Sequence, residues 1–254
     1  MNFSISPRSL LKFFLVSVSF LSLAQLCIIA AQHVPGHGRY DEFMKIFNFN
    51  NESNIPTLYS SINLMLSAFL LFCIGMMHRR TGTPWKAWIG LALIMSFLSV
   101  DETASIHEKL IEPTQAFLGV REELYYVWIM PYLSAAAILF LSYFRFFMKL
   151  PVRTRTLFIL SGGIFILGAA GFETQGNLEQ IRQLNTLSYR FGLLLEELFE
   201  MLGVICFIYA LADYIANRFG QFSITISPQE SNAMSDIQVA AKRYGMRPSL
   251  DENL

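Results

Sequence analysis

Six long apolar segments are the feature that most constrains the fold of this chain. A helix needs about 20 apolar residues to cross the roughly 30 Å hydrocarbon core of a bilayer. None of the segments alternates between apolar and polar residues as barrel strands do. The segments therefore predict an all-α, polytopic six-helix transmembrane bundle over residues 1–219, followed by a polar cytoplasmic tail over 220–254. The predicted spans are 10–31, 57–77, 85–104, 124–148, 156–172 and 191–215.

The composition supports a membrane protein. Of the 254 residues, 54% are hydrophobic and 15% are charged, whereas soluble domains are about 25% charged. Lys and Arg together number 19, and Asp and Glu together also number 19, so the formal net charge is zero. Nucleic-acid binding normally needs a basic excess. We therefore expect the lipid bilayer as a partner and no nucleic acid, while other membrane subunits or a homo-oligomer stay open.

The distribution of positive charge predicts the orientation of the bundle. Cytoplasmic connections of membrane proteins are enriched in Lys and Arg. The richer set is Arg8, Lys12, Arg79, Arg80, Lys86, Arg145, Lys149, Arg153, Arg155 and Arg218; the poorer set is Arg39, Lys45, Lys109, Arg121, Arg182 and Arg190. Both termini are then cytoplasmic, and connections 32–56, 104–123 and 173–190 face outward. The expected location is a bacterial inner (plasma) membrane, with the outward side facing the periplasm or exterior.

Three carboxylates interrupt the last apolar segment, at Glu196, Glu197 and Glu200. Glu200 lies about 13 Å along the helix from Phe191, at 1.5 Å per residue. An acid at such a depth costs several kcal/mol unless it has a partner or faces water, and is a functional-site hypothesis by default. The alternative is a structural carboxylate paired with a neighbouring helix.

A second ionisable cluster ends the third segment, at Asp101, Glu102, His107 and Glu108. In a continuous helix, Asp101 and Glu108 share one face, while Glu102 and His107 point elsewhere. Imidazole and carboxylate groups together suit several divalent metals. With Asp101 beside them, the predicted metal ligands are Glu102, His107, Glu108, Glu173, Glu197 and Glu200. No Glu-x-x-His pair of the ferritin type is present, and a solvated helix end is the competing interpretation.

Two further features have structural interpretations. Arg145 and Asp213 lie near the inner ends of their segments, so we predict an ion pair between them. His78 lies beside Arg79 on the cytoplasmic side, which excludes it from an outward site. The small residues in 161–163 and 168–171 predict close helix packing and a central position for the fifth span.

The third and fifth spans end alike, at 101–103 (DET) and 172–174 (FET), and each returning span begins near Glu-Glu-Leu. Spans 3–4 and 5–6 therefore suggest a parallel repeat of the kind found in transporters. The similarity involves few residues, so chance similarity stays an open alternative.

The stretches LSVDETASIHE (98–108) and LLEELFEMLG (194–203) together resemble those of uncharacterised multi-span bacterial membrane proteins. The resemblance extends over most of the membrane region and implies no activity.

Three hypotheses for function follow from these residues. The first is a metal-dependent membrane enzyme, in which a divalent metal activates water against a lipid or quinone-like substrate. The second is a proton- or cation-coupled transporter that uses the buried acids. The third is a non-catalytic subunit or assembly factor of a membrane complex.

Overall fold

The computed structural model describes residues 6–31, 41–51, 53–119, 127, 129–172 and 187–220. The chain divides into a helical unit, Phe3–Gln221, and a second unit, Phe222–Leu254. The second unit, which contains nearly all of the predicted tail, lies outside the described residues. Everything below concerns the helical unit.

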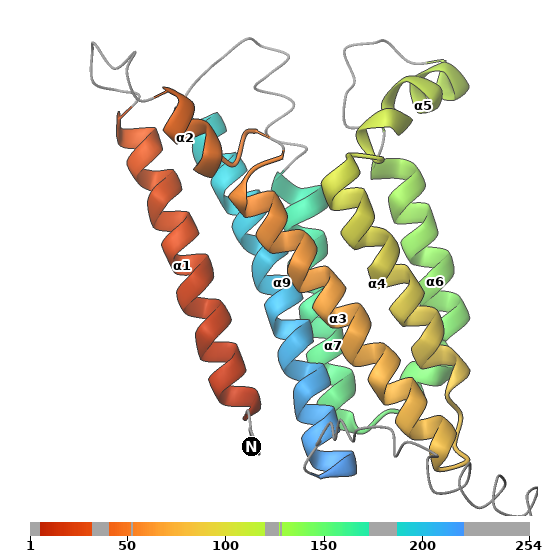
Figure 1. Ribbon diagram of the computed structural model, residues 1–254. Helices are drawn as coiled ribbons and strands as arrows, with labels where there is room; N and C mark the ends of the chain where they lie inside the picture. Colours follow the sequence, from red (N-terminus) through yellow and green to blue (C-terminus); the bar gives the residue numbers. More distant parts are fainter. Residues whose placement is uncertain are drawn as a thin grey trace, which may run out of the picture. The chain divides into compact units, whose positions relative to one another are not determined.

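The predicted all-α class is confirmed, and the described ranges contain no strand. The helices are α1 (Pro7–Ala31), α2 (Asp41–Phe47), α3 (Ile55–Arg80), α4 (Lys86–Ala104), η1 (Glu108–Leu110), α5 (Ile111–Leu118), α6 (Ile129–Lys149), α7 (Val152–Ile166), η3 (Leu167–Phe172) and α9 (Leu187–Phe219) (Figure 1). The sequence analysis did not predict the short helices α2 and α5.

Five helices of the described chain are long and apolar enough to cross a membrane, which confirms a membrane protein at this level. They are Pro7–Ala31, Ile55–Arg80, Lys86–Ala104, Ile129–Lys149 and Val152–Gly171. The sixth predicted span falls within α9, which has 33 residues and carries the three carboxylates.

Local sequence signals explain several helix boundaries. The Asn54 side chain caps α3 by accepting a hydrogen bond from the backbone N–H of Thr57 at 2.9 Å, and Pro56 occupies the first turn, where no backbone N–H is needed. The connection from α3 to α4 is short and contains Gly82 at φ +69°, a conformation that glycine adopts without strain. Pro151 directly precedes α7.

The long helices run between two ends that differ in charge (Figure 1). One, here called the basic end, holds the α3–α4 and α6–α7 connections and the last turn of α9. The basic residues around it are Arg79, Arg80, Lys86, Lys149, Arg153, Arg155 and Arg218. The opposite end, here called the acidic end, holds the last turn of α4 and the first half of α9, with Asp101, Glu102, Glu196, Glu197 and Glu200.

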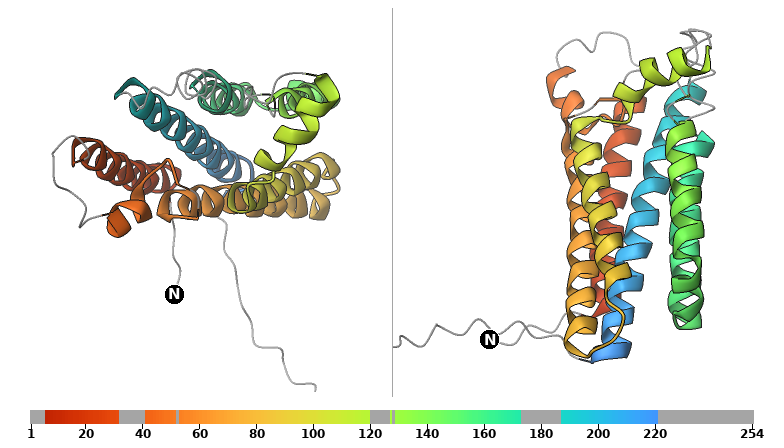
Figure 2. Two further views of the ribbon diagram at one scale, coloured as in Figure 1. Left: turned by 90° about the horizontal axis from the view of Figure 1, so that it is seen from above. Right: turned by 90° about the vertical axis from the view of Figure 1, so that its right-hand side faces the viewer.

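Helix α9 is the central element, since it packs against α1, α3, α7 and η3 (Figure 2). Its buried side chains include Met201, Ile205, Ile208 and Leu211. The fifth predicted span was expected to be central, and that expectation was wrong. The α7 helix buries only Thr154, Phe158 and Ser161, because it lies at the side of α9.

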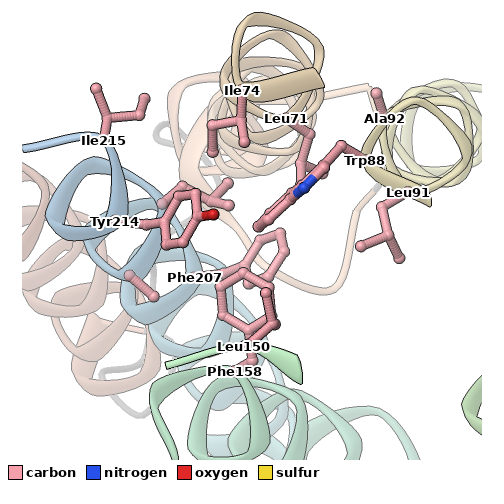
Figure 3. Packing of buried hydrophobic residues seen from close by; sticks show 12 residues of the cluster. Leu71, Ile74, Trp88, Leu91, Ala92, Leu150, Phe158, Phe207, Tyr214 and Ile215 are labelled. Carbon is pink, nitrogen blue, oxygen red and sulfur yellow. The ribbon is translucent and has the colours of Figure 1, made fainter. Parts of the chain in front are cut away.

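Two apolar clusters hold the bundle together. Toward the basic end, α3, α4, α7 and α9 surround the fully buried Trp88, which packs with Leu71, Phe158, Phe207 and Tyr214 (Figure 3). The other joins α1, α3 and α9 through residues that include Val18, Leu64, Met201, Ile205 and Ile208. Complete burial of a large apolar side chain contributes about 1.5–3 kcal/mol in water. Within a bilayer, close van der Waals packing takes over that role.

Candidate functional site

A buried carboxylate, Asp101, organises the acidic end of α4. It is 5% exposed. Its Oδ1 accepts the backbone N–H of His107 at 2.9 Å and lies 3.3 Å from His107 Nδ1. Its Oδ2 accepts the hydroxyl of Tyr132, on the first turn of α6, at 2.9 Å. Three groups from two segments therefore hold one carboxylate.

The local backbone explains how Asp101 meets His107. Helix α4 ends at Ala104, and Ser105 takes a left-handed conformation with φ 48° and ψ 48°. This residue reverses the chain and returns His107 over the last turn of α4. The expectation that a continuous helix points His107 away from Asp101 was wrong, because helical spacing does not continue past Ala104.

The contact gives His107 a defined chemistry. When the neutral imidazole donates its Nδ1 proton to Asp101, the lone pair lies on Nε2. A carboxylate that orients a histidine in this way occurs behind metal ligands and behind catalytic bases. The side chain of His107 is 25% exposed, whereas that of Asp101 is 7% exposed. The pair thus combines a buried orienting group with an accessible imidazole.

The backbone of α9 at Glu196 and Glu200 packs against the π-helical turn η3. A Cβ atom added at Gly168 would lie 2.8 Å from the carbonyl oxygen of Glu196 and 2.9 Å from the backbone nitrogen of Glu200. One added at Gly203 would lie 2.8 Å from the backbone nitrogen of Phe165. The predicted close packing of small residues is confirmed at Gly168. Nothing lies within 4 Å of a Cβ atom at Gly162.

The structure describes only part of the predicted ligand set. Glu102, Glu197 and Glu200 are half-buried. The side chain of Glu108 and all of Glu173 lie outside the described residues. Within the described part of the chain, no three His, Cys, Asp or Glu side chains lie close enough to hold a metal ion. The structure brings together Asp101 and His107, and a metal site over the full predicted set stays a prediction.

Two site residues escaped the sequence analysis. Tyr132 is uncharged and lies in a segment rich in apolar residues, so only its position in the first turn of the returning helix could have signalled a role. Asn63, on α3, is 1% exposed, and neither its Oδ1 nor its Nδ2 makes a hydrogen bond of normal geometry within the described residues. The Tyr59 hydroxyl, one turn earlier on α3, is its polar neighbour. A lone Asn in an apolar helix carries no periodic signal.

The depth of Asn63 follows from the packing of α3 on α9. Both helices run from the acidic end to the basic end (Figure 1), and His78 contacts Tyr214 between them at 2.8 Å. Asn63 precedes His78 by 15 residues, and Phe199 precedes Tyr214 by the same number. Because helices rise equally per residue, Asn63 lies at about the level of Phe199, between Glu197 and Glu200 along α9.

The ion pair predicted for Asp213 has a different partner. Arg153 of α7 donates from Nε to Oδ2 at 2.8 Å and from Nη2 to Oδ1 at 3.1 Å. The prediction of Arg145 was wrong, since no ion pair joins Arg145 and Asp213, both of which are described. The reason is that α7, and not α6, is the direct neighbour of α9.

The fold and these polar groups define an α-helical membrane protein with a carboxylate–histidine pair at one end. Residues 12–214 match the model of a domain of unknown function, DUF8692. The chain therefore belongs to the DUF8692 family, in agreement with the expected uncharacterised membrane family. No curated protein and no solved structure matches the chain.

Proposed function

We propose that this protein spans the membrane six times, with both termini in the cytoplasm and the acidic end outside. The location that we propose is a bacterial inner membrane. Two observations support the topology. The described basic end carries many Lys and Arg residues and one acid, Asp213, as the positive-inside rule requires. Helix α9, at 33 residues, is about 50 Å long, which exceeds the roughly 30 Å needed for a span.

We further propose that the protein is a metal-dependent membrane enzyme whose site faces outward. The observation that carries this proposal is the Asp101–His107 pair, in which a buried carboxylate orients an accessible imidazole. His107 supplies Nε2 to the metal, and the carboxylates of Glu102, Glu108, Glu173, Glu197 and Glu200 are the remaining candidate ligands. A bound divalent metal supplies an activated water at neutral pH. The position of the site favours a lipid or quinone-like substrate.

Metal analysis of the purified chain tests the enzyme proposal. We expect a near-stoichiometric metal, measured by inductively coupled plasma mass spectrometry, in the detergent-purified protein. His107→Ala and the double variant Glu197→Ala/Glu200→Ala should lose it. Glu112→Ala is the matched control, since Glu112 is an exposed acid on α5 that lies outside the predicted set. Absence of metal from the wild type, or equal metal in wild type and His107→Ala, would contradict the proposal.

A proton- or cation-coupled transporter is the second candidate, and Asn63 favours it. Its amide is buried, makes no hydrogen bond of normal geometry within the described residues and lies about level with the carboxylates of α9. A buried amide of this kind fits a path that water or an ion enters transiently. A liposome flux assay separates this candidate from the enzyme: flux that requires both Asn63 and Glu200, in a protein without metal, would favour transport.

The exposed surface of α6 is compatible with the third candidate, a subunit of a membrane complex or a homo-oligomer. Only Ile129 of α6 is buried. Purification in mild detergent distinguishes this candidate, since a stoichiometric partner is expected only for a subunit.

A further inference from the structure

A cavity of about 490 Å³ with charged residues in its lining lies at the basic end, where α7 begins and α9 ends. Arg153 and Thr154 line it from α7, and Asp213, Asn217 and Arg218 line it from α9. It is separate from the Asp101–His107 pair, which lies at the opposite end of the bundle (Figure 1). The function proposed above makes no use of this cavity.

The guanidinium group of Arg153 retains binding capacity inside this cavity. Its Nε and Nη2 atoms donate to Asp213, and Nη2 also donates to the hydroxyl of Tyr209 at 3.1 Å. Arginine carries five N–H donors in a planar fork. The two on Nη1 have no partner among the described residues, and the side chain is 63% exposed. Asp213 therefore fixes the plane of the guanidinium and leaves one edge available.

The charge of the cavity suits a singly charged anion. Arg153 and Arg218 contribute two positive charges and Asp213 one negative charge, which leaves a net charge of +1. A phosphate diester carries a charge of −1. Guanidinium groups bind phosphate oxygens through directed, charge-assisted hydrogen bonds.

An exposed apolar face of α7 leads away from this cavity. Val152, Ile159 and Ile166 are 68%, 59% and 45% exposed, and they are spaced seven residues apart, which places them on one side of the helix. Arg153 follows Val152, about 100° further round the helix, and its side chain is also exposed. Helix α7 thus presents a phosphate-binding group at its basic end and a hydrocarbon-like surface along its length.

We propose that this cavity and the exposed face of α7 form a binding site for one anionic phospholipid. The phosphate diester accepts hydrogen bonds from Nη1 of Arg153 and from Arg218, and an acyl chain lies along Val152, Ile159 and Ile166. Basic pockets between membrane helices on the cytoplasmic side bind anionic headgroups in this manner. The apolar face favours a lipid over a free phosphate.

Lipid titration of the full-length chain tests the site. Delipidated protein in detergent is titrated with phosphatidylglycerol, phosphatidylcholine or soluble glycerol phosphate, and bound lipid is counted by native mass spectrometry. We expect phosphatidylglycerol to bind at least about fivefold more tightly than phosphatidylcholine. Glycerol phosphate, which lacks acyl chains, should not displace it at equal concentration.

Two charge-matched variants locate the site. Arg218→Gln removes one lining charge without touching the Arg153–Asp213 pair, and should weaken phosphatidylglycerol binding about fivefold. Arg80→Gln removes another exposed charge at the basic end, outside the cavity, and should change binding less than about twofold. The melting temperature of each variant is measured first, so that a loss of lipid binding is not mistaken for a loss of folding.

Three results would overturn the proposal. Equal affinity for the two phospholipids would remove the role of the net charge. If Arg218→Gln and Arg80→Gln weaken phosphatidylglycerol binding equally, the lipid is attracted by the whole basic end and not by this cavity. If glycerol phosphate displaces bound lipid as effectively as phosphatidylglycerol does, the site binds a phosphate compound without acyl chains.

Discussion

The imidazole of His78 joins α3 to α9 by a 2.8 Å contact between its Nε2 and the hydroxyl of Tyr214. Its Nδ1 lies 2.6 Å from the Thr83 hydroxyl, and its ring stacks on Trp88 at 5.6 Å with an interplanar angle of 9°. One ring nitrogen therefore joins α3 to α9, and the other holds the connection that follows α3. The exclusion of His78 from an outward site agrees with its place at the basic end.

This contact predicts the effect of Tyr214→Phe. The change leaves Nε2 of a buried histidine without its partner, so we expect a loss of about 1–3 kcal/mol in the free energy of unfolding. Chemical denaturation in detergent, followed by circular dichroism, measures it. Tyr209→Phe removes a hydroxyl whose hydrogen bond with Arg153 is exposed, and should cost less. Equal losses for the two variants would contradict the prediction.

Replacement of Asn63 should stabilise the protein. Asn63→Leu keeps the number and branching of the side-chain heavy atoms, in a larger volume, and removes two buried polar atoms that make no hydrogen bond of normal geometry. Since an unsatisfied buried group costs about 1–3 kcal/mol, we expect the free energy of unfolding to rise by a comparable amount. Ser67→Ala serves as the control, because its hydroxyl already donates to the Asn63 carbonyl at 2.9 Å. A destabilised Asn63→Leu protein would contradict the prediction, and would mean either that the amide is satisfied by a partner or that the larger Leu overpacks the site.

The glycines of α7, η3 and α9 should respond oppositely to alanine. At Gly168 and Gly203 an added methyl group meets backbone atoms at 2.8 Å, and overpacking of this kind costs about 1–3 kcal/mol. At Gly162 nothing lies within 4 Å, so alanine should raise helix stability by up to about 1 kcal/mol. Melting temperatures of the three variants check the sign. A stable Gly203→Ala protein would show that the two helices have room to separate.

Asp101→Asn tests the orienting role of the carboxylate in the proposed metal site. The amide keeps the shape of the group, but it lacks the charge that orients His107. Loss of such an outer partner typically lowers metal affinity by 10–100-fold, and we expect this range in a chelator competition assay. Tyr132→Phe, which leaves Asp101 charged, should have a smaller effect. Unchanged affinity in Asp101→Asn would separate the Asp101–His107 pair from metal binding.

The partner of Asp213 can be confirmed by removing each arginine in turn. Arg153→Gln leaves the nearly buried Asp213 carboxylate without its partner, so the thermal stability should fall. Arg145→Gln removes the same charge from α6 and should leave the stability unchanged. A loss of thermal stability in Arg145→Gln but not in Arg153→Gln would contradict the Arg153–Asp213 pairing.

Much of the fold was predictable because bilayer thickness imposes helix length. Segment 85–104 matches α4 to within one residue, and segment 57–77 lies within α3, which is longer at both ends. The predictions from the sequence were wrong where tertiary contacts, and not helical periodicity, decide which side chains meet. The turn at Ser105 ends the helical spacing that separated Asp101 from His107. The choice between Arg145 and Arg153 depends on which helix adjoins α9, which a single sequence does not encode locally.

Helix α6 differs from its neighbours in how it is held. With Ile129 as its one buried residue, it is attached through side chains: the Tyr132 hydroxyl on Asp101, the Tyr143 hydroxyl against Gly90, and Phe146 against Trp88. Segments with few buried contacts open at low free-energy cost. We therefore expect α6 to detach before α3, α4 and α9 when the bundle unfolds. Because Tyr132 leaves with α6, the earliest step in unfolding is also one that removes a hydrogen bond from Asp101.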